Sequence, residues 1–360
     1  MQFIDLKQQY QALRPEIAER IQRVLDHGQF ILGPEVAELE QALCQYTGSA
    51  HCVTVASGTE AMLMALMAAG IGPGDEVIVP AFTFAATAEV VVLAGATPVF
   101  ADVDAGTAML VPAAVTACIT PRTRAVIPVS LYGQCPDMDA LQDAAGGLPV
   151  IEDAAQSFGA SWNGVRSCRL SRIGCTSFFP SKPLGCYGDG GAIFTDDAAL
   201  AQALREIRIH GQSRRYWHTR IGVGGRMDTL QCAVVLAKLG RFDWELEQRS
   251  RVGERYDALL PAAARRIARQ AGSTHVFAQY TVRVPDREKV IARLAEAGIP
   301  TAVHYPVPLN QQPAYKAFPC PAGAPASAAL AAEVLSLPMS ADLTLGDQDR
   351  VIAALGAALH

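Results

Sequence analysis

Short runs of β-branched and other apolar residues alternate with longer, alanine-rich segments of helical period between residues 41 and 196. The runs predict strands at 52–55, 76–79, 98–103, 125–129, 149–151, 176–179 and 192–194. Such alternation is typical of an α/β protein in which helices cover both faces of a mostly parallel sheet. Ligands of these sheets bind at the carboxyl ends of the strands, so the residues that follow each run are the first candidates for chemistry.

Beyond the last predicted strand the pattern becomes helical and then mixed. A helical stretch reaches Arg208, and a loop rich in glycine and arginine follows at 211–226. The next pattern predicts one long helix over about 228–260. Residues 275–284 alternate like a strand, and 287–297 have helical period.

The composition changes near residue 241, because 261–270 and 321–332 are rich in alanine and proline. With 360 residues, the chain is long enough for about two domains of roughly 150 residues each. We therefore predict a large domain over 1–240 and a smaller α/β domain over 241–360.

The charge balance is that of an ordinary globular chain. Thirty Lys and Arg residues against thirty-five Asp and Glu residues leave a net charge of −5, and half of all residues are apolar. A nucleic-acid binder is expected to be basic and a disordered chain poor in apolar residues, so neither class fits. The apolar stretches are shorter than the roughly 20 residues of a bilayer span, and the first residues do not resemble a secretory signal. We expect a cytoplasmic protein without a membrane segment.

The cysteines and histidines suggest neither a disulfide framework nor a metal site. Nine cysteines is an odd number, and none of them forms a C-x-x-C pair, which favours free thiols. The seven histidines include no H-x-x-x-H pair, so we expect no bound metal.

The segment Ser57-Gly58-Thr59-Glu60 follows the first predicted strand and precedes an apolar run. It fits the capping box of a helix N-terminus, and a structural cap is the simpler interpretation. A strand, a glycine turn and a helix N-terminus also make an anion site, because free backbone N–H groups and the helix dipole favour phosphate.

Two further segments carry candidate chemistry. Glu152 and Asp153 end a predicted strand, where a carboxylate could be simply solvated or could hold a cationic ring nitrogen. Lys182 follows the next predicted strand in an apolar setting rich in glycine and proline. Most lysines are surface charges, but desolvation here would lower the pKa of this amine and activate it for covalent chemistry with a carbonyl. Lysine, acid and phosphate site together indicate pyridoxal phosphate.

Three rival classes lack their motifs. The runs 188–191 and 222–225 do not complete G-x-G-x-x-G, because Ile193 and Met227 occupy the last position of each. There is no G-x-x-x-x-G-K-[ST] for an NTPase and no G-x-S-x-G for a hydrolase.

With these residues in place, the chain resembles the pyridoxal-phosphate-dependent sugar aminotransferases of fold type I, the DegT/DnrJ/EryC1/StrS family. The motifs that carry the resemblance are at 3–6, 33–36, 57–59, 80–84, 128–134, 152–156, 177–191, 226–228, 303–306 and 337–339. The resemblance implies a mostly parallel seven-stranded sheet with helices on both faces and a smaller C-terminal α/β domain. It also implies a homodimer with shared active sites.

The resemblance further implies roles for individual residues. Lys182 matches the lysine that binds the cofactor, Asp153 the partner of its ring nitrogen, and Gln156 the residue near its phenolic oxygen. Gly58, Thr59 and Ser177 match the phosphate site, and Phe84 matches the aromatic that stacks on the ring, although a core aromatic is the simpler interpretation. The implied substrate-binding residues are Arg226, His304 and Tyr305. Gly224 departs from the pattern, since many relatives have an asparagine there that reaches the phosphate across the subunit interface.

The runs 128–134 and 177–191 are most similar to the branch of the family that aminates a UDP-linked 2-acetamido-3-oxo-glucuronate. We therefore expect transfer of an amino group from L-glutamate to the 3-keto group of that nucleotide sugar, for a bacterial surface polysaccharide. The alternative is a neutral 3-keto or 4-keto nucleotide sugar. A sugar dehydratase of the same fold fits this sequence less well, because such relatives have a histidine in place of the lysine, whereas Lys182 is present here. A non-catalytic binding protein would not need the lysine, the acid and the phosphate site together.

Overall fold

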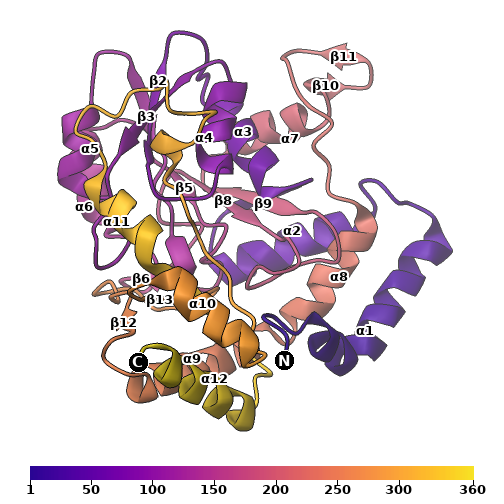
Figure 1. The fold of residues 1–360 in the computed structure, drawn as a ribbon. Helices are drawn as coiled ribbons and strands as arrows, with labels where there is room; N and C mark the ends of the chain where they lie inside the picture. Colours follow the sequence, from indigo (N-terminus) through magenta and orange to yellow (C-terminus); the bar gives the residue numbers. More distant parts are fainter.

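The computed structural model describes residues 1–360, and its helices lie around a central sheet (Figure 1). The helices are α1 Leu6–His27, α2 Pro34–Thr47, α3 Gly58–Ala68, α4 Ala86–Leu93, α5 Pro112–Cys118, α6 Met138–Ala145, α7 Ala198–Arg208, α8 Thr229–Leu239, α9 Phe242–Leu259, α10 Arg287–Glu296, α11 Pro325–Glu333 and α12 Leu345–Ala358. Two short 3₁₀ helices are η1 Leu131–Gly133 and η2 Leu309–Gln311.

The strands near the predicted positions form the central layer. They are β1 His51–Val55, β2 Glu76–Pro80, β3 Thr97–Ala101, β4 Thr123–Val126, β5 Ile151–Asp153, β8 Ile173–Ser177 and β9 Gly191–Thr195. The remaining strands are β6 Ser161–Trp162, β7 Val165–Arg166, β10 Gln212–Arg214, β11 Trp217–His218, β12 Arg265–Arg266, β13 Tyr280–Arg283 and β14 Val334–Leu337.

The central strands form two hydrogen-bonded groups, β1-β9-β8-β5 and β3-β2-β4. Isolated parallel bridges, Val126 to Val150 and Val129 to Asp153, connect the end of β4 with β5 and its approach. The pairings between β5 and β8 and between β2 and its two neighbours are parallel. Strand β9 runs antiparallel to both β1 and β8. The carboxyl ends of β1, β5 and β8 therefore meet at one edge.

The sheet is fixed by apolar cores on its faces. A cluster of 28 buried residues joins β1, β2 and β9 to α3, α4 and α7, and a second cluster of 17 packs α2 and α8 against β1 and β9. A separate cluster of 17 buried residues joins α9, α10 and α12 to β13 and β14. Burial of apolar surface at roughly 25 cal/mol per Å² is the main stabilising contribution of such cores.

Two expectations about the second half of the chain are wrong. The long helix predicted over 228–260 is two helices, because α8 ends at Leu239 and α9 begins at Phe242. Gly240 stands between them, and glycine is a poor helix former. The strand predicted over 275–284 is formed only over Tyr280–Arg283. Phe277 has a φ of +47°, which an extended strand does not allow.

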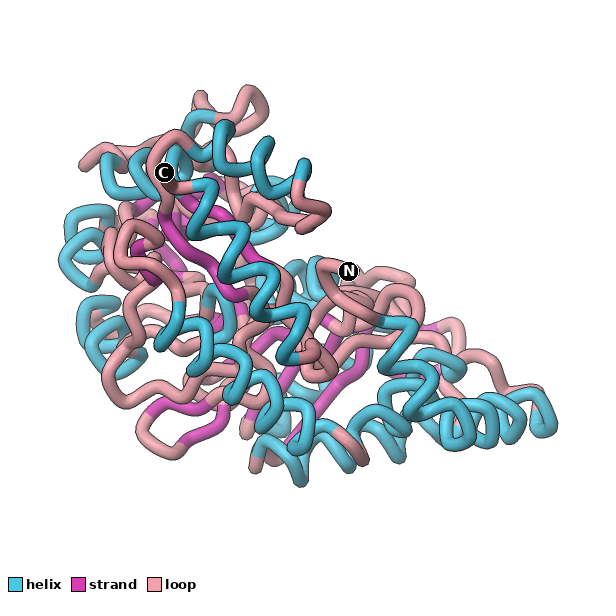
Figure 2. Tube along the Cα trace, turned by 60° about the horizontal axis from the view of Figure 1, so that its bottom comes forward, coloured by secondary structure: helices cyan, strands magenta, loops and turns pink.

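Helix α1 stands out from the body of the molecule beside α8, as Figures 1 and 2 show. The loop at its far end carries three apolar residues that are about half exposed, Phe30, Ile31 and Leu32. No helix of the structure is both long enough and apolar enough to cross a bilayer.

Candidate active site

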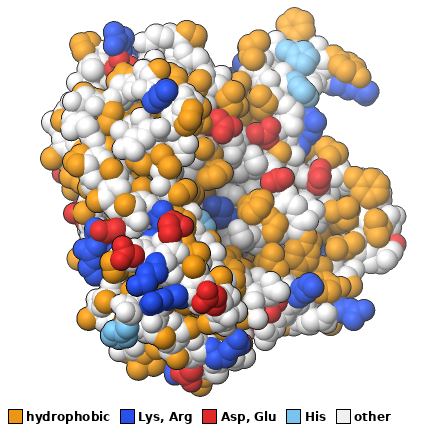
Figure 3. Space-filling view, in the orientation of Figure 1, with side chains coloured by type: hydrophobic (Ala, Val, Ile, Leu, Met, Phe, Trp, Pro, Cys, Tyr) orange, Lys and Arg blue, Asp and Glu red, His pale blue; other side chains and the backbone are white.

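The predicted site residues gather where the sequence pattern placed them, at the carboxyl edge of the sheet. Gly58 and Thr59 follow β1, Asp153 ends β5, and Ser177 ends β8. Lys182 lies in the loop between β8 and β9. Figure 3 shows a hollow near the centre of one face of the molecule, with basic and histidine side chains deep within it.

The N-terminus of α3 packs tightly against the end of β8. Ser57 caps the helix, because its hydroxyl oxygen accepts a hydrogen bond of 3.0 Å from the backbone N–H of Glu60. A Cβ atom added to Gly58 would lie 2.7 Å from the Cβ atom of Ser177. The first turn of α3 thus presents free backbone N–H groups beside the Ser177 hydroxyl, which is an arrangement suited to phosphate.

The close approach of Gly58 gives a testable prediction. Replacing Gly58 with alanine should lower the free energy of unfolding by about 1–3 kcal/mol, because an extra methyl group overpacks the contact with Ser177. Urea denaturation of the cofactor-free protein measures this change. The matched control is Gly346→Ala, since a Cβ atom at Gly346 meets nothing within 4 Å. Equal stability of the two variants would contradict the close approach.

The carboxylate of Asp153 is buried and held in place by two donors. The hydroxyl of Thr87 donates to Oδ2 at 2.9 Å, and the backbone N–H of Ala155 donates to Oδ1 at 3.2 Å. Burial raises the pKa of Asp153, whereas these hydrogen bonds and the charge of Lys182 lower it. A cation placed against this carboxylate would favour its ionised form.

The neighbouring Glu152 points to a different part of the protein. Its carboxylate accepts hydrogen bonds from the Ser167 hydroxyl at 2.8 Å and from the backbone N–H of Cys168 at 2.9 Å. Burial raises the pKa of Glu152 to about 7. Side chains of consecutive strand residues alternate between the two faces of a sheet, so Asp153 faces the site and Glu152 does not.

Lys182 and Asp153 are close enough for their charges to interact. Burial lowers the pKa of the Lys182 amine, while the charge of Asp153 raises it by a smaller amount. The amine is thus biased toward its neutral, nucleophilic form. The structure brings together the predicted lysine and the predicted acid.

His304 lies near Lys182 and is already engaged. Its Nδ1 atom shares a hydrogen bond of 2.8 Å with the hydroxyl of Ser336, and its backbone carbonyl accepts a hydrogen bond from Tyr132. Burial, and then the positive charge of Lys182, lower the pKa of His304 to about 4. At neutral pH the imidazole is therefore uncharged and cannot form an ion pair with a carboxylate.

Gln156 connects Tyr132 and Tyr305. Its side-chain oxygen accepts the backbone N–H of Tyr132 at 2.8 Å, and its nitrogen donates to the hydroxyl of Tyr305 at 3.1 Å. Burial raises the pKa of Tyr305. The ring centroid of Phe84 lies 5.9 Å from that of Tyr305, and Phe84 is 54% exposed. The simpler interpretation of Phe84, an ordinary core aromatic, is therefore wrong, because its ring is open to a ligand.

Arg226 stands near the start of α3. Burial raises the pKa of the nearby Glu60, and the positive charge of Arg226 lowers that pKa by a smaller amount. The two side chains form no ion pair, and the Oε2 atom of Glu60 is buried without a hydrogen-bond partner. A Cβ atom added to Gly224 would lie 3.4 Å from Nη2 of Arg226. The alternative interpretation of Arg226, a structural ion pair, finds no partner within this chain.

Two residues of the site were not predicted from the sequence. Thr87 fixes Asp153 from 66 positions away, and Tyr132 connects Gln156 with the carbonyl of His304. Thr87 lies in the first turn of α4, just after the motif at 80–84. The sequence signal that could have identified it is this position shortly after the predicted strand at 76–79.

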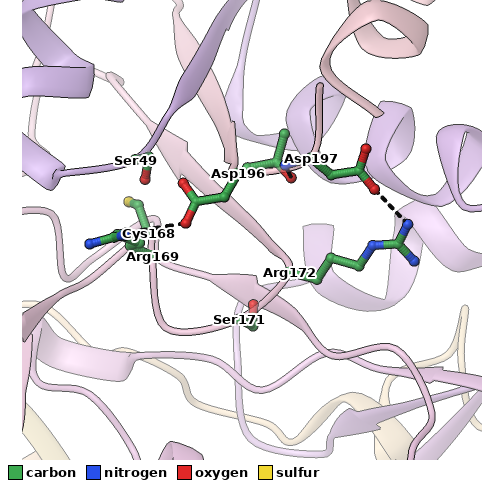
Figure 4. Close-up of a pocket in the computed structure, with 8 residues that line it drawn as sticks. Ser49, Cys168, Arg169, Ser171, Arg172, Asp196 and Asp197 are labelled. Atoms are coloured by element: carbon green, nitrogen blue, oxygen red, sulfur yellow. Dashed lines mark hydrogen bonds and ion pairs between the residues drawn. The ribbon is translucent and has the colours of Figure 1, made fainter. Parts of the chain in front are cut away.

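Another cavity, of about 310 Å³, lies at the opposite edge of the sheet. Figure 4 shows its ion pairs, Arg169 with Asp196 and Arg172 with Asp197, at 3.3 Å and 2.8 Å. It is beside the amino end of β1, whereas the predicted site residues follow the carboxyl ends. None of the predicted site residues lines it.

Comparison with known proteins identifies the family of the chain. Residues 11–356 match the DegT/DnrJ/EryC1/StrS aminotransferase family. The chain is 53% identical to a UDP-2-acetamido-2-deoxy-3-oxo-D-glucuronate aminotransferase of Pseudomonas aeruginosa, over 99% of each chain. It is 42% identical to a UDP-N-acetyl-3-dehydro-alpha-D-glucosamine 3-aminotransferase of Acidithiobacillus ferrooxidans, over 99% of this chain and 97% of that one.

A solved structure shares the whole fold. The crystal structure of DesV from S. venezuelae, in complex with a ketimine intermediate, superposes with a TM-score of 0.96 at 40% identity. The match covers 100% of this chain and 98% of that chain. The arrangement of the elements described above is therefore the aminotransferase fold.

Proposed function

Because the chain belongs to the DegT/DnrJ/EryC1/StrS aminotransferase family and is an aminotransferase, we propose that it moves an amino group from L-glutamate to the 3-keto group of a UDP-linked 2-acetamido-3-oxo-glucuronate. The observation that carries the chemistry is the pairing of Lys182 with the buried Asp153 beside the phosphate-type turn at Gly58. The substrate class is supported by the 53% identity to the P. aeruginosa enzyme.

The residues at the carboxyl edge fit pyridoxal phosphate. The first turn of α3 with Gly58, Thr59 and Ser177 would hold the phosphate, and the half-exposed ring of Phe84 would stack on the cofactor ring. Gln156 would lie near the phenolic oxygen. When bound, the cofactor supplies an aldehyde for covalent capture of amines and a ring that accepts an electron pair.

Each of these residues has a defined task in the proposed reaction. The Lys182 amine, biased toward its neutral form by burial, takes a proton from the α-carbon of the donor and later returns a proton to the sugar carbon. Asp153, oriented by Thr87, holds the ring nitrogen protonated. General acid–base catalysis of this kind contributes about 10²- to 10⁴-fold in rate.

Arg226 is the proposed receptor for the sugar carboxylate. Its guanidinium forms no ion pair within the chain and can bind a carboxylate with two parallel hydrogen bonds. We propose that Tyr305 and the neutral His304 accompany it through hydrogen bonds, since His304 carries no charge at neutral pH.

The substrate proposal is tested by Arg226→Met. Loss of a charge-assisted contact worth about 1.5–3 kcal/mol should lower kcat/KM for the 3-oxo-uronate by about 10- to 100-fold. The neutral 3-oxo-hexose analogue should lose little. Arg350→Met is the control, because Arg350 is an exposed arginine on α12 outside this loop. An equal loss on both sugars would show that Arg226 does not bind the carboxylate.

The second candidate is amination of a neutral 3-keto or 4-keto nucleotide sugar, which the similarity to the A. ferrooxidans enzyme favours. Incubation with L-glutamate and each keto sugar, followed by mass identification of the product, distinguishes the two. A faster reaction with the neutral sugar in the wild-type protein would select this candidate.

We also propose a homodimer in the cytoplasm. Exposed apolar side chains at the tip of α1 and in the segment around β11, among them Ile31, Trp217 and Ile221, would be covered by a second copy of the chain. All nine cysteines are free, as expected in a reducing compartment. Light scattering of the purified protein measures the number of copies in the assembly, and a monomer would contradict the proposed homodimer.

We likewise propose a division into domains 1–240 and 241–360, which the separate core around β13 supports.

A further inference from the structure

A second, much smaller cavity adjoins Lys182 on the side of the N-terminal segment. Its volume is about 10 Å³. Its walls come from four parts of the chain that are far apart in sequence. They contribute Asp5 and Gln9 from the N-terminal segment, Lys182 from the loop after β8, Glu245 and Arg249 from α9, and Asp342 from the turn before α12.

Two polar atoms in these walls are buried without any hydrogen-bond partner, Oε1 of Gln9 and Nε of Arg249. The amide nitrogen of Gln9 is fixed by Glu245, since it donates to both carboxylate oxygens at 2.9 Å and 2.8 Å. Arg249 is only 4% exposed, and its Nη1 atom donates to the carbonyl of Phe277 at 3.0 Å. The unsatisfied acceptor and the unsatisfied donor thus belong to two residues that line the same cavity as the lysine.

Buried groups without partners are rare, and in native proteins ordered water usually satisfies them. A single water needs roughly 10–15 Å³ and two to four polar partners, and this cavity offers that volume. We propose that the cavity holds one water molecule that joins the Lys182 amine to Gln9 and Arg249, and that these two side chains position the amine whenever it is not bound covalently.

The proposal deepens the proposed function and rests on it in one respect, namely that Lys182 alternates between a bound and a free amine. A free amine that exchanges protons must stay close to the reacting carbon and remain neutral part of the time. The water would give it a hydrogen-bonded resting position, while burial opposes its permanent protonation.

Charged and titratable groups surround the amine from every packed element. They are Asp5 from the N-terminal segment, Asp153 from β5, Glu245 and Arg249 from α9, His304 from the loop after α10, and Asp342 from the turn before α12. Gln9 also lines the cavity and is neutral, so its replacement by leucine changes no formal charge. It is therefore the residue to test.

The first experiment uses the cofactor-free chain. The rate of reductive methylation of Lys182 is measured against pH by peptide mass mapping, in the wild-type protein and in Gln9→Leu. Loss of the acceptor should destabilise the ammonium form, so the midpoint should fall by about half to one pH unit. Gln8→Leu is the matched control, because Gln8 is exposed on the same helix, and its midpoint should not move. An unchanged midpoint in Gln9→Leu would overturn the proposal.

A high-resolution crystal structure of the wild-type protein provides the second test, which holds even if Gln9→Leu does not fold. An ordered water within hydrogen-bond distance of Gln9 Oε1 and Arg249 Nε supports the proposal, and an empty cavity overturns it. If Lys182 responds to Gln9 but the protein converts no keto sugar, the proposed function fails while the positioning role stands.

Discussion

Replacement of Lys182 by alanine is expected to abolish amino transfer, with a fall in rate of at least about 10²- to 10⁴-fold. The substitution removes both the nitrogen that would bind the cofactor and the base that would move the proton. The fold should persist, because burial lowers the pKa of this amine and its charged form therefore adds no stability. Turnover with glutamate and thermal melting are the two measurements.

The site of covalent attachment can be checked directly. Borohydride reduction of the cofactor-loaded wild-type protein, followed by peptide mapping, should find the cofactor on Lys182. Lys316→Ala serves as the control, since Lys316 is exposed and distant from β8 in sequence, and it should retain full activity. Attachment to any other lysine would disprove the assignment.

The sequence pattern predicts that the strands of the site exist but displaces their bounds, because each is only a short apolar run. The strand expected over 149–151 lies at Ile151–Asp153, and the one expected over 176–179 lies at Ile173–Ser177. Asp153 and Ser177 therefore end their strands, whereas the pattern put Asp153 beyond its strand and Ser177 within its strand. The direction of β9 could not be predicted, because its residues are apolar on both faces whichever way the strand runs. The break between α8 and α9 was missed because the helical pattern continues across a single glycine.

The contacts that tune the site depend on pairs far apart in sequence. Gln9 and Glu245 are 236 positions apart, and no local pattern connects them. Tyr132 and His304 are 172 positions apart. Motifs therefore point to the residues that are proposed to perform the chemistry, whereas the residues that orient them appear only after the chain has folded.

The side-chain directions on β5 separate two acids that the sequence left as alternatives. Asp153 accepts a hydrogen bond from the Thr87 hydroxyl at the carboxyl edge of the sheet. Glu152 instead accepts hydrogen bonds from the Ser167 hydroxyl and from the backbone N–H of Cys168. Only Asp153 has the charge of Lys182 among the influences on its pKa. Substitutions at Asp153 and Glu152 therefore provide a matched pair of variants.

Asp153→Asn should bind the cofactor but lose about 10²- to 10⁴-fold in turnover, because a neutral amide cannot hold the ring nitrogen protonated. The asparagine oxygen can accept from the backbone N–H of Ala155 while its NH₂ group donates to the hydroxyl oxygen of Thr87, so the fold should be unaffected. Glu152→Gln should keep both its turnover and its stability, because the amide oxygen can accept from the backbone N–H groups of Cys168 and Leu170 while the NH₂ group donates to the hydroxyl oxygen of Ser167. Turnover and urea denaturation of both variants decide the assignment: near-native turnover in Asp153→Asn, together with inactive but stable Glu152→Gln, would transfer the role to Glu152.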